Sequence, residues 1–237
     1  MTDDLLVREC ERFGQTLQTI IDGTVGPGAA AFELVVDSGS ECRIGPGPLF
    51  GGDGQFPFRD IPLVRRCDSP DQPTVFLRVS FTCELDAEGE HMAVKKSTFG
   101  LFLKVLAKKK PRPLVRVEYE RDQTPDTPNA HVHLHAVSQE LGWLRGGAGQ
   151  PFKEMQDLHF PVGGRRFRPT VEEFLFFLHR EELFTDWAVE GWRTNLKASQ
   201  GDWEERQAKA TVRRHEEVAV AYLRERGYDI EGPQRST

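Results

Sequence analysis

The chain has 237 residues and a formal net charge of −6, with 38% hydrophobic and 29% charged residues. This balance is typical of one large globular domain, or of one domain with a helical appendage. No apolar run approaches the ~20 residues that cross a bilayer, and the acidic start of the chain is unlike a signal peptide. The negative charge also argues against a general nucleic-acid binder. We therefore expect a cytoplasmic protein with no membrane partner.

Cysteine usage indicates the same compartment. No CxxC or other metal-ligand spacing occurs among Cys10, Cys42, Cys67 and Cys83. Isolated cysteines of this kind are typical of reduced, mostly buried thiols in a cytosolic protein.

The first half of the chain is expected to form a helix and then an antiparallel sheet. Apolar residues at helical spacing predict an amphipathic helix from Asp3 to about Ile21. The segments 74–86 and 92–105 predict a long hairpin with one apolar and one polar face, which is typical of an antiparallel sheet. Further strands are predicted at 30–37, 42–44, 114–121 and 131–137, with a short edge strand at 158–162.

Helical patterns dominate the rest of the chain. Thr170 and Glu173 form a capping-box pair that predicts a helix start near Thr170, and further helices are predicted at 187–196 and 203–226. The predicted fold class is α+β: an antiparallel meander with an N-terminal helix and C-terminal helices packed on one face. We expect residues 1–184 to form this domain. Residues 185–237 would form a helical extension that docks on the domain or projects as an interaction arm.

Histidine repeats on a fixed period in the segment HVHLHAV, residues 131–137. Successive side chains of a strand point to opposite faces, so the aliphatic residues would face the core. His131, His133 and His135 would then stand together on the other face. This row is the main chemical signal in the sequence.

The preceding strand, 114–121, would place charged residues beside this row. If the two strands are neighbours, their apolar residues must face the same core. Arg116, Glu118 and Glu120 then lie beside the imidazoles. Imidazoles and a carboxylate are suitable ligands for zinc or a similar divalent ion, and the same groups could instead form an acid–base pair. The aligned apolar sets are Val115, Val117 and Tyr119 with Val132, Leu134 and Ala136.

Strand geometry limits the metal hypothesis. Residues on one face lie about 6.6–7 Å apart along a strand, so two of the imidazoles can bind one ion together, and we take His133 and His135 as that pair. A structural row on a solvated or loop-covered face is the alternative. The catalytic candidates are His131, His133, His135, Glu118 and Glu120.

Two resemblances add functional expectations. The letters HVHLHAV match the H-φ-H-φ-H-φ-φ signature of the histidine-triad nucleotide hydrolases and transferases. This resemblance implies that His133 attacks a phosphorus atom while His131 and His135 assist. The order of meander, His-x-His strand and helices is also similar to small uncharacterised bacterial proteins, among them the TumE-type toxins. That resemblance implies a cytosolic effector acting on RNA or nucleotides beside a DNA-binding partner.

An arginine cluster precedes the helix predicted at Thr170. Helix N-terminal amides favour anions, and arginine side chains fork onto phosphate. Arg165, Arg166 and Arg168 are therefore candidate substrate contacts. Pairing of these arginines with the acids of the first helical turn is the alternative.

Two functions follow from these residues. The first is a cytosolic hydrolase or transferase of nucleotide or RNA phosphoesters, with His133 at its centre and an optional, zinc-like divalent metal. The second is a non-enzymatic binding or regulatory protein whose sheet and C-terminal helices hold a protein partner. Replacement of His133 by alanine would separate the two.

Overall fold

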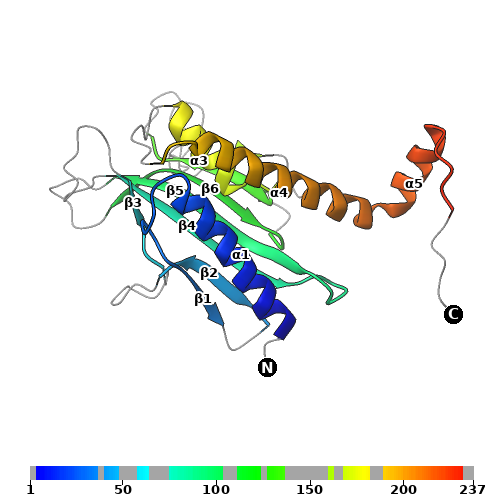
Figure 1. The fold of residues 1–237 in the computed structure, drawn as a ribbon, viewed down its shortest axis with the longest axis horizontal. Helices are drawn as coiled ribbons and strands as arrows, with labels where there is room; N and C mark the ends of the chain where they lie inside the picture. The colour runs from blue at the N-terminus through cyan, green and yellow to red at the C-terminus, as the bar shows by residue number, and fades with distance from the viewer. Residues whose placement is uncertain are drawn as a thin grey trace, which may run out of the picture.

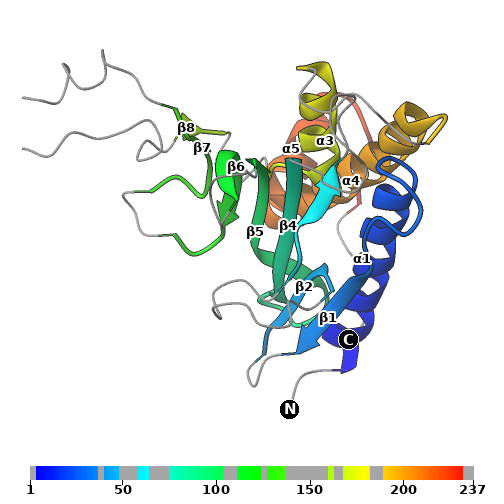
Figure 2. The ribbon, with the colours of Figure 1, turned by 90° about the vertical axis from the view of Figure 1, so that its left-hand side faces the viewer.

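The computed structural model describes residues 4–36, 40–47, 58–63, 75–103, 111–123, 127–136, 160–162, 168–181 and 189–231. Within them the chain forms an eight-stranded antiparallel sheet with helices against one face (Figures 1 and 2), so the predicted α+β class is confirmed. The helices are α1 (Asp4–Asp22), α3 (Val171–Arg180), α4 (Trp192–Arg214) and α5 (Glu216–Glu225). The strands are β1 (Phe32–Val36), β2 (Cys42–Pro46), β3 (Ile61–Leu63), β4 (Val75–Leu85), β5 (Met92–Leu103), β6 (Arg112–Glu120), β7 (Ala130–Leu134) and β8 (Phe160–Pro161).

Strand order in the sheet follows chain order. The path is β1-β2-β4-β5-β6-β7-β8, and β3 pairs with the start of β4 on the same side as β2. The sequence did not predict β3, because its three residues include Pro62 and are too few to show alternation. β7 is shorter than predicted and ends at Leu134, so His135 follows the strand.

The C-terminal helices also differ from the prediction. A single helix, α4, joins the first predicted segment to the first half of the second, and it runs through Gly201. The break comes later, at His215, whose backbone is not helical, and α5 begins directly after it. One glycine within a helix costs only about 1 kcal/mol. Gly201 therefore does not end α4.

The core lies between the helices and one face of the sheet. Phe99 on β5 connects the layers, because its ring centroid lies 5.5 Å from that of Phe81 and 6.2 Å from that of Phe174 on α3. Phe13 on α1 meets Phe81 edge-to-face at 4.8 Å. Each such side chain contributes about 1.5–3 kcal/mol when fully buried. The buried stripe of α1 recurs at helical spacing and consists of Leu6, Cys10, Leu17, Ile20 and Ile21.

Three described cysteines lie in this core. Cys10, Cys42 and Cys83 are buried and form no disulfide with one another, and they lie where α1 covers β2 and β4. The hydrogen bond with Cys83 and burial both raise the pKa of the Cys10 thiol, so it stays protonated and unreactive. These three agree with the expectation of reduced, buried thiols; Cys67 lies outside the described residues.

The opposite face of the sheet is polar. Residues paired across antiparallel strands point to the same face, and one such row runs from Ser80 through Thr98 and Glu118 to His131. The adjacent row contains Gly100, Arg116 and His133. Figure 2 shows α1, α3 and α4 on the other side of the strands, so none of these helices covers the polar rows.

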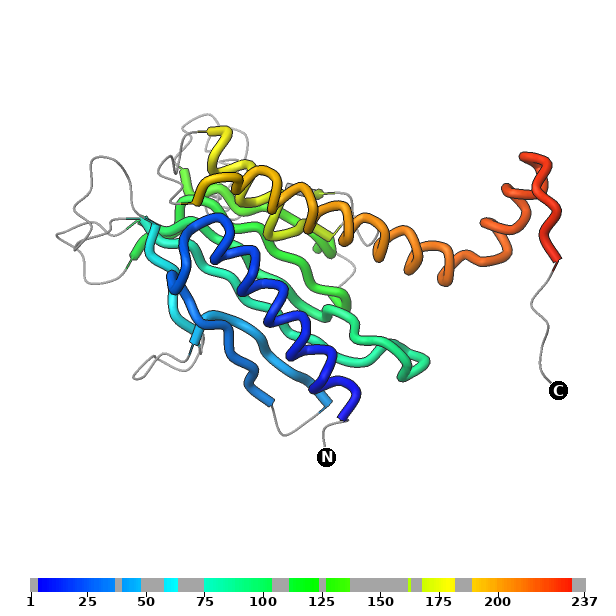
Figure 3. Tube along the Cα trace, in the orientation of Figure 1, coloured from blue at the N-terminus to red at the C-terminus, as the bar shows by residue number. Residues whose placement is uncertain are grey.

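The C-terminal helices extend away from the sheet. The first part of α4 packs on the domain: Leu196 is fully buried, and Asn195 donates to the carbonyl oxygen of Gly23 at 3.1 Å. The last turns of α4 project past the sheet and place α5 at its far end (Figures 1 and 3). α5 buries none of its residues. No helix among the described residues has the length and apolar character needed to cross a bilayer.

Candidate functional site

The site lies where β6 and β7 run side by side. Their register places Glu118 opposite His131 and Arg116 opposite His133. Opposed side chains of an antiparallel pair lie close enough to interact directly. The four charged or titratable side chains therefore form one cluster on the polar face.

Hydrophobic alternation holds this register. Val117 lies opposite Val132 on the helix-covered face, and both pack against the core. The predicted alignment is corrected at one end: Tyr119 lies opposite Ala130, whereas Ala136 falls beyond the end of β7. A shift by one residue would turn the aliphatic side chains out and the imidazoles in, which burial of the aliphatic face prevents.

The Glu118 carboxylate contacts both imidazoles and the guanidinium. Its Oε2 lies 3.6 Å from Nε2 of His131 and 3.4 Å from Nε2 of His133. Its Oε1 lies 3.2 Å from Nη1 of Arg116. One carboxylate oxygen thus contacts both imidazoles, while the other contacts the guanidinium.

A carbonyl group sets the tautomer of His131. Nδ1 of His131 lies 2.9 Å from the carbonyl oxygen of Pro128, and because a proline carbonyl can only accept, Nδ1 is the donor. In the neutral ring, Nε2 then carries a lone pair that faces the carboxylate of Glu118. Two acceptors at this separation repel each other unless a proton or a cation lies between them.

The cluster is buried on its histidine side and more open on its other side. His131 and His133 are 3% and 7% exposed. The side chains of Glu118 and Arg116 are 21% and 34% exposed. A ligand from solvent therefore reaches the cluster past Glu118 and Arg116.

Electrostatics favour the charged forms of Glu118 and His131. Burial would raise the pKa of Glu118, but the hydrogen bond from His131 and the charge of Arg116 outweigh it and lower that pKa to about 2. The hydrogen bond with Glu118 raises the pKa of His131, against burial and with help from the Pro128 carbonyl. Both shifts favour the pairing of an imidazolium with a carboxylate.

The same atoms match the spacing of metal ligands. Glu118, His131 and His133 each offer one ligand atom, and these atoms all lie within 4.8 Å of one another. Around a tetrahedral zinc ion with bonds of about 2.0–2.2 Å, ligand atoms lie about 3.4 Å apart. The two carboxylate–imidazole distances are close to that value. The Pro128 carbonyl on the opposite ring nitrogen is also the kind of partner that metal-bound histidines have.

Other residues predicted for the site lie elsewhere. Glu120 forms an ion pair with Lys96 at 3.1 Å and accepts a hydrogen bond from Gln123. His135 follows β7, where its backbone N–H donates to the carbonyl oxygen of Leu114, and it is not part of the three-ligand group. The candidate ligands that the structure brings together are thus His131 and His133 with Glu118, rather than His133 with His135.

The arginine cluster does not join the histidines. Arg168 lies on the helix-covered side, where its guanidinium carbon is 4.1 Å from the ring centroid of Trp203 on α4. The sheet therefore separates it from His131 and His133. Arg165 and Arg166 lie outside the described residues.

Three contributions to the site were not predicted from the sequence. Arg116 was predicted to lie on the correct face, because it alternates with the apolar residues of its strand. No role was predicted for its side chain. Pro128 acts only through its carbonyl, for which the sequence carries no signal. Gly100 lies opposite Arg116, where a Cβ would be 2.7 Å from the Phe102 ring and 3.4 Å from Cγ of Arg116.

Comparison with known proteins gives no relative. No family model, no curated protein and no solved structure matches the chain. The resemblances to histidine-triad enzymes and to TumE-type toxins therefore stay predictions, and function has to be argued from the site.

Proposed function

We propose that the protein binds one divalent transition-metal ion, zinc or a similar ion, through Glu118, His131 and His133. The observation that carries this proposal is the approach of two imidazole Nε2 atoms to one carboxylate oxygen, at 3.4 and 3.6 Å. Because Nδ1 of His131 donates to Pro128, Nε2 is the ring nitrogen that faces Glu118 and would bind the ion. Two imidazoles and a carboxylate are the ligand set of many catalytic zinc sites, which keep one further position for water.

We further propose that this centre hydrolyses or transfers phosphoesters, with nucleotides or RNA as substrates in the cytosol. A bound ion of this kind lowers the pKa of its water to about 7 and so supplies a nucleophile. Arg116 lies on the open side of the cluster, and its guanidinium is suited to binding a phosphate oxygen. Pro128 holds His131 in one orientation, and Glu118 balances the charge of Arg116 until substrate arrives.

Metal binding is tested on protein purified without a histidine tag and stripped with a chelator. Titration with Zn²⁺ and Co²⁺, followed by elemental analysis, should give one ion per chain, and Co²⁺ should give the visible absorption of a tetrahedral site. His131→Ala and Glu118→Gln should each weaken binding by more than about 100-fold.

Glu120→Gln is the matched control, since it removes the same charge from the next same-face position of β6. It should bind as the wild type does. Wild-type protein that takes up no stoichiometric ion, or equal losses in Glu118→Gln and Glu120→Gln, would contradict the metal site.

The reaction is tested separately with bis(p-nitrophenyl) phosphate and short RNA, with and without the ion. We expect metal-dependent turnover that Arg116→Met lowers by at least about tenfold in kcat/KM, while metal stoichiometry is unchanged. An ion that binds without any turnover would disprove the hydrolase proposal and leave the metal site standing.

A second candidate function is protein binding through the C-terminal arm, defined as α4 beyond Trp203 together with α5. Val218, Tyr222 and Leu223 on α5 are 67%, 55% and 37% exposed, an unusual set of apolar side chains to leave in water. The first turn of α5 carries Glu216 and Glu217, and Arg224 and the C-cap residue Arg226 flank Glu225 at its end. Two antiparallel copies of α5 would pair opposite charges, so the best-supported partner is a second copy of the chain.

Light scattering during gel filtration tests this candidate. The wild type should be a dimer, and Val218→Asp and Tyr222→Asp should make it a monomer. Thr211→Asp is the control, because it adds the same charge to an exposed position of α4 outside the apolar set. A monomeric wild type, or loss of the dimer in the control as well, would disprove self-association through α5.

A further inference from the structure

A cavity of about 90 Å³ lies between α1, α3 and α4, on the opposite side of the sheet from Glu118 and the histidines. Its apolar wall includes Phe13, Leu17 and Val171. Its polar wall includes Arg168 and Thr170. The cavity has room for about three waters, or for one small organic molecule.

Arg168 is the unusual group in this cavity. Only 9% of the residue is exposed, and its guanidinium stacks on the ring of Trp203. Within the described part of the chain, no carboxylate lies within ion-pair distance of Arg168 and its guanidinium makes no hydrogen bond. Burial lowers the pKa of Arg168 to about 10, so it remains charged at neutral pH.

A buried cation without an acceptor is costly, since desolvation is not offset by a partner. The nearest acid along the chain, Glu172, accepts a hydrogen bond from the hydroxyl of Ser199 at 2.5 Å and forms no ion pair with Arg168. The hydroxyl of Thr170 accepts from the amide of Glu173 and keeps its own proton for donation. At this part of the wall, the guanidinium of Arg168 and the hydroxyl of Thr170 can donate to a ligand, whereas Glu172 and Asp202 are acceptors.

The charges of the lining select the kind of anion. Two cations, Arg168 and Arg206, and two acids, Glu172 and Asp202, line the cavity, so its formal charge is zero. A dianion such as phosphate would add two negative charges beside two acids. A monoanion that also fills the apolar wall meets less repulsion and buries more apolar surface.

We propose that this cavity binds a small aliphatic monocarboxylate, with its carboxylate on the guanidinium of Arg168 and the hydroxyl of Thr170. The planar fork of arginine matches a carboxylate and can donate to both oxygens. The short hydrocarbon chain then lies against Phe13, Leu17 and Val171. Asp202 and Arg206 are exposed and mark the side from which such a ligand enters.

Thermal unfolding and fluorescence of the full chain test this site. Sodium acetate, propionate and butyrate are compared with sodium chloride, sodium sulfate and sodium phosphate at equal ionic strength. At a hundredfold excess over its Kd, a bound carboxylate should raise Tm by about 5 °C. Carboxylate should also change the emission of Trp203, and Trp203→Phe identifies that part of the signal.

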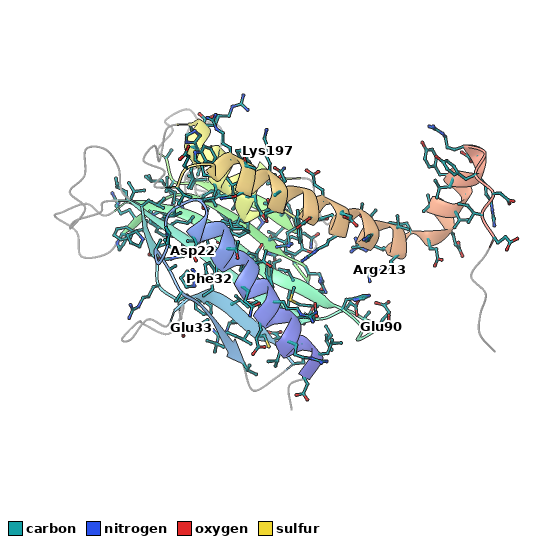
Figure 4. The ribbon with its side chains drawn as sticks, viewed as in Figure 1. Asp22, Phe32, Glu33, Glu90, Lys197 and Arg213 are labelled. Carbon is teal, nitrogen blue, oxygen red and sulfur yellow. The ribbon has the colours of Figure 1, made fainter. Side chains whose placement is uncertain are left out.

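Arg168→Met should fold, because an apolar isostere removes the desolvated charge, and it should lose the carboxylate-dependent shift. Arg213→Met is the control: Arg213 is an exposed arginine near the far end of α4 (Figure 4) and its replacement should leave the shift unchanged. If Arg168→Met does not fold, saturable quenching of Trp203 by propionate in the wild type decides the question.

Three results would overturn the proposal. The first is the absence of any effect of the carboxylates beyond that of chloride. The second is stabilisation by phosphate but not by propionate. The third is a shift that survives in Arg168→Met. Metal binding at Glu118 should be the same in all these variants, because the sheet separates the two sites.

Discussion

The two faces of the sheet are built from the same strands but are held in different ways. On the helix-covered face, bulky side chains such as Phe81 and Phe99 are buried among many neighbours, and no single contact determines the geometry. On the polar face, His131 and Glu118 owe their positions to a few directional contacts. Because side chains alternate between the two faces along β6 and β7, this strand pair contributes both to the core and to the candidate site. Stability and site chemistry should therefore respond to different substitutions.

The largest effect is expected on the helix-covered face. Phe99→Ala should lower the free energy of unfolding by about 3–5 kcal/mol, because Phe99 is fully buried and contacts both Phe81 and Phe174. Urea unfolding measures this loss. Metal stoichiometry per folded molecule should stay the same, since Phe99 faces away from the histidines; a large fall in stoichiometry would mean that the two faces are not independent.

The next effect concerns the polar face and depends on pH. Glu118, with its pKa lowered from 4.5 to about 2, stabilises the fold above about pH 4.5 and loses that contribution as pH falls toward 2. His131, with its pKa raised from 6.5, stabilises below that value and loses its contribution as pH rises through its folded pKa. The metal-free protein should thus gain most from the pair between about pH 4.5 and 6.5, by up to about 3 kcal/mol.

Urea unfolding at a series of pH values checks this window. Glu118→Gln should reduce the change in the free energy of unfolding with pH on both the acidic and the basic side of this window. Addition of Zn²⁺ should make the free energy of unfolding rise with pH across this window, because protons then compete with the ion for the imidazoles. A pH profile that Glu118→Gln leaves unchanged would contradict the coupling of the two groups.

A smaller effect is expected at Gly100, which lies opposite Arg116. Gly100→Ala brings a methyl group to 2.7 Å from the Phe102 ring and 3.4 Å from Cγ of Arg116. The ring and the arginine must move, which should cost about 1–2 kcal/mol. The displacement of Arg116 should also lower phosphoester turnover more than it weakens metal binding. Equal losses of both would show that Gly100 supports the whole strand instead.

The smallest effect is expected at the ion pair of Glu120 and Lys96. These side chains are 36% and 50% exposed, and such pairs contribute about 0–1 kcal/mol. Glu120→Gln should therefore change the free energy of unfolding by less than about 1 kcal/mol, with high salt removing the difference. A loss comparable to that in Glu118→Gln would indicate that Glu120 belongs to the site.

Several features of the site could be predicted from the sequence because they depend only on the alternation of side chains between the two faces of a strand. Alternation in 114–121 and 131–137 indicated that Glu118 would share a face with His131 and His133, and the strands pair with that parity. Alternation does not determine which residues of two neighbouring strands lie opposite each other. The role of Glu118 therefore could not be separated from that of Glu120. Nor does alternation determine where a strand ends, which is why His135 was grouped with its neighbours.

By itself, the sequence determined the helix–sheet architecture and the division of each strand into an apolar and a polar face, because these follow from local periodicity. The capping box of Thr170 and Glu173 was likewise local and is present in the structure. The tertiary structure decided which atoms meet: Pro128 on His131, one oxygen of Glu118 between two imidazoles, and Arg168 buried beneath Trp203. Those contacts depend on the paths of connecting segments and on how helices cross the sheet, and no short-range pattern in the chain encodes them.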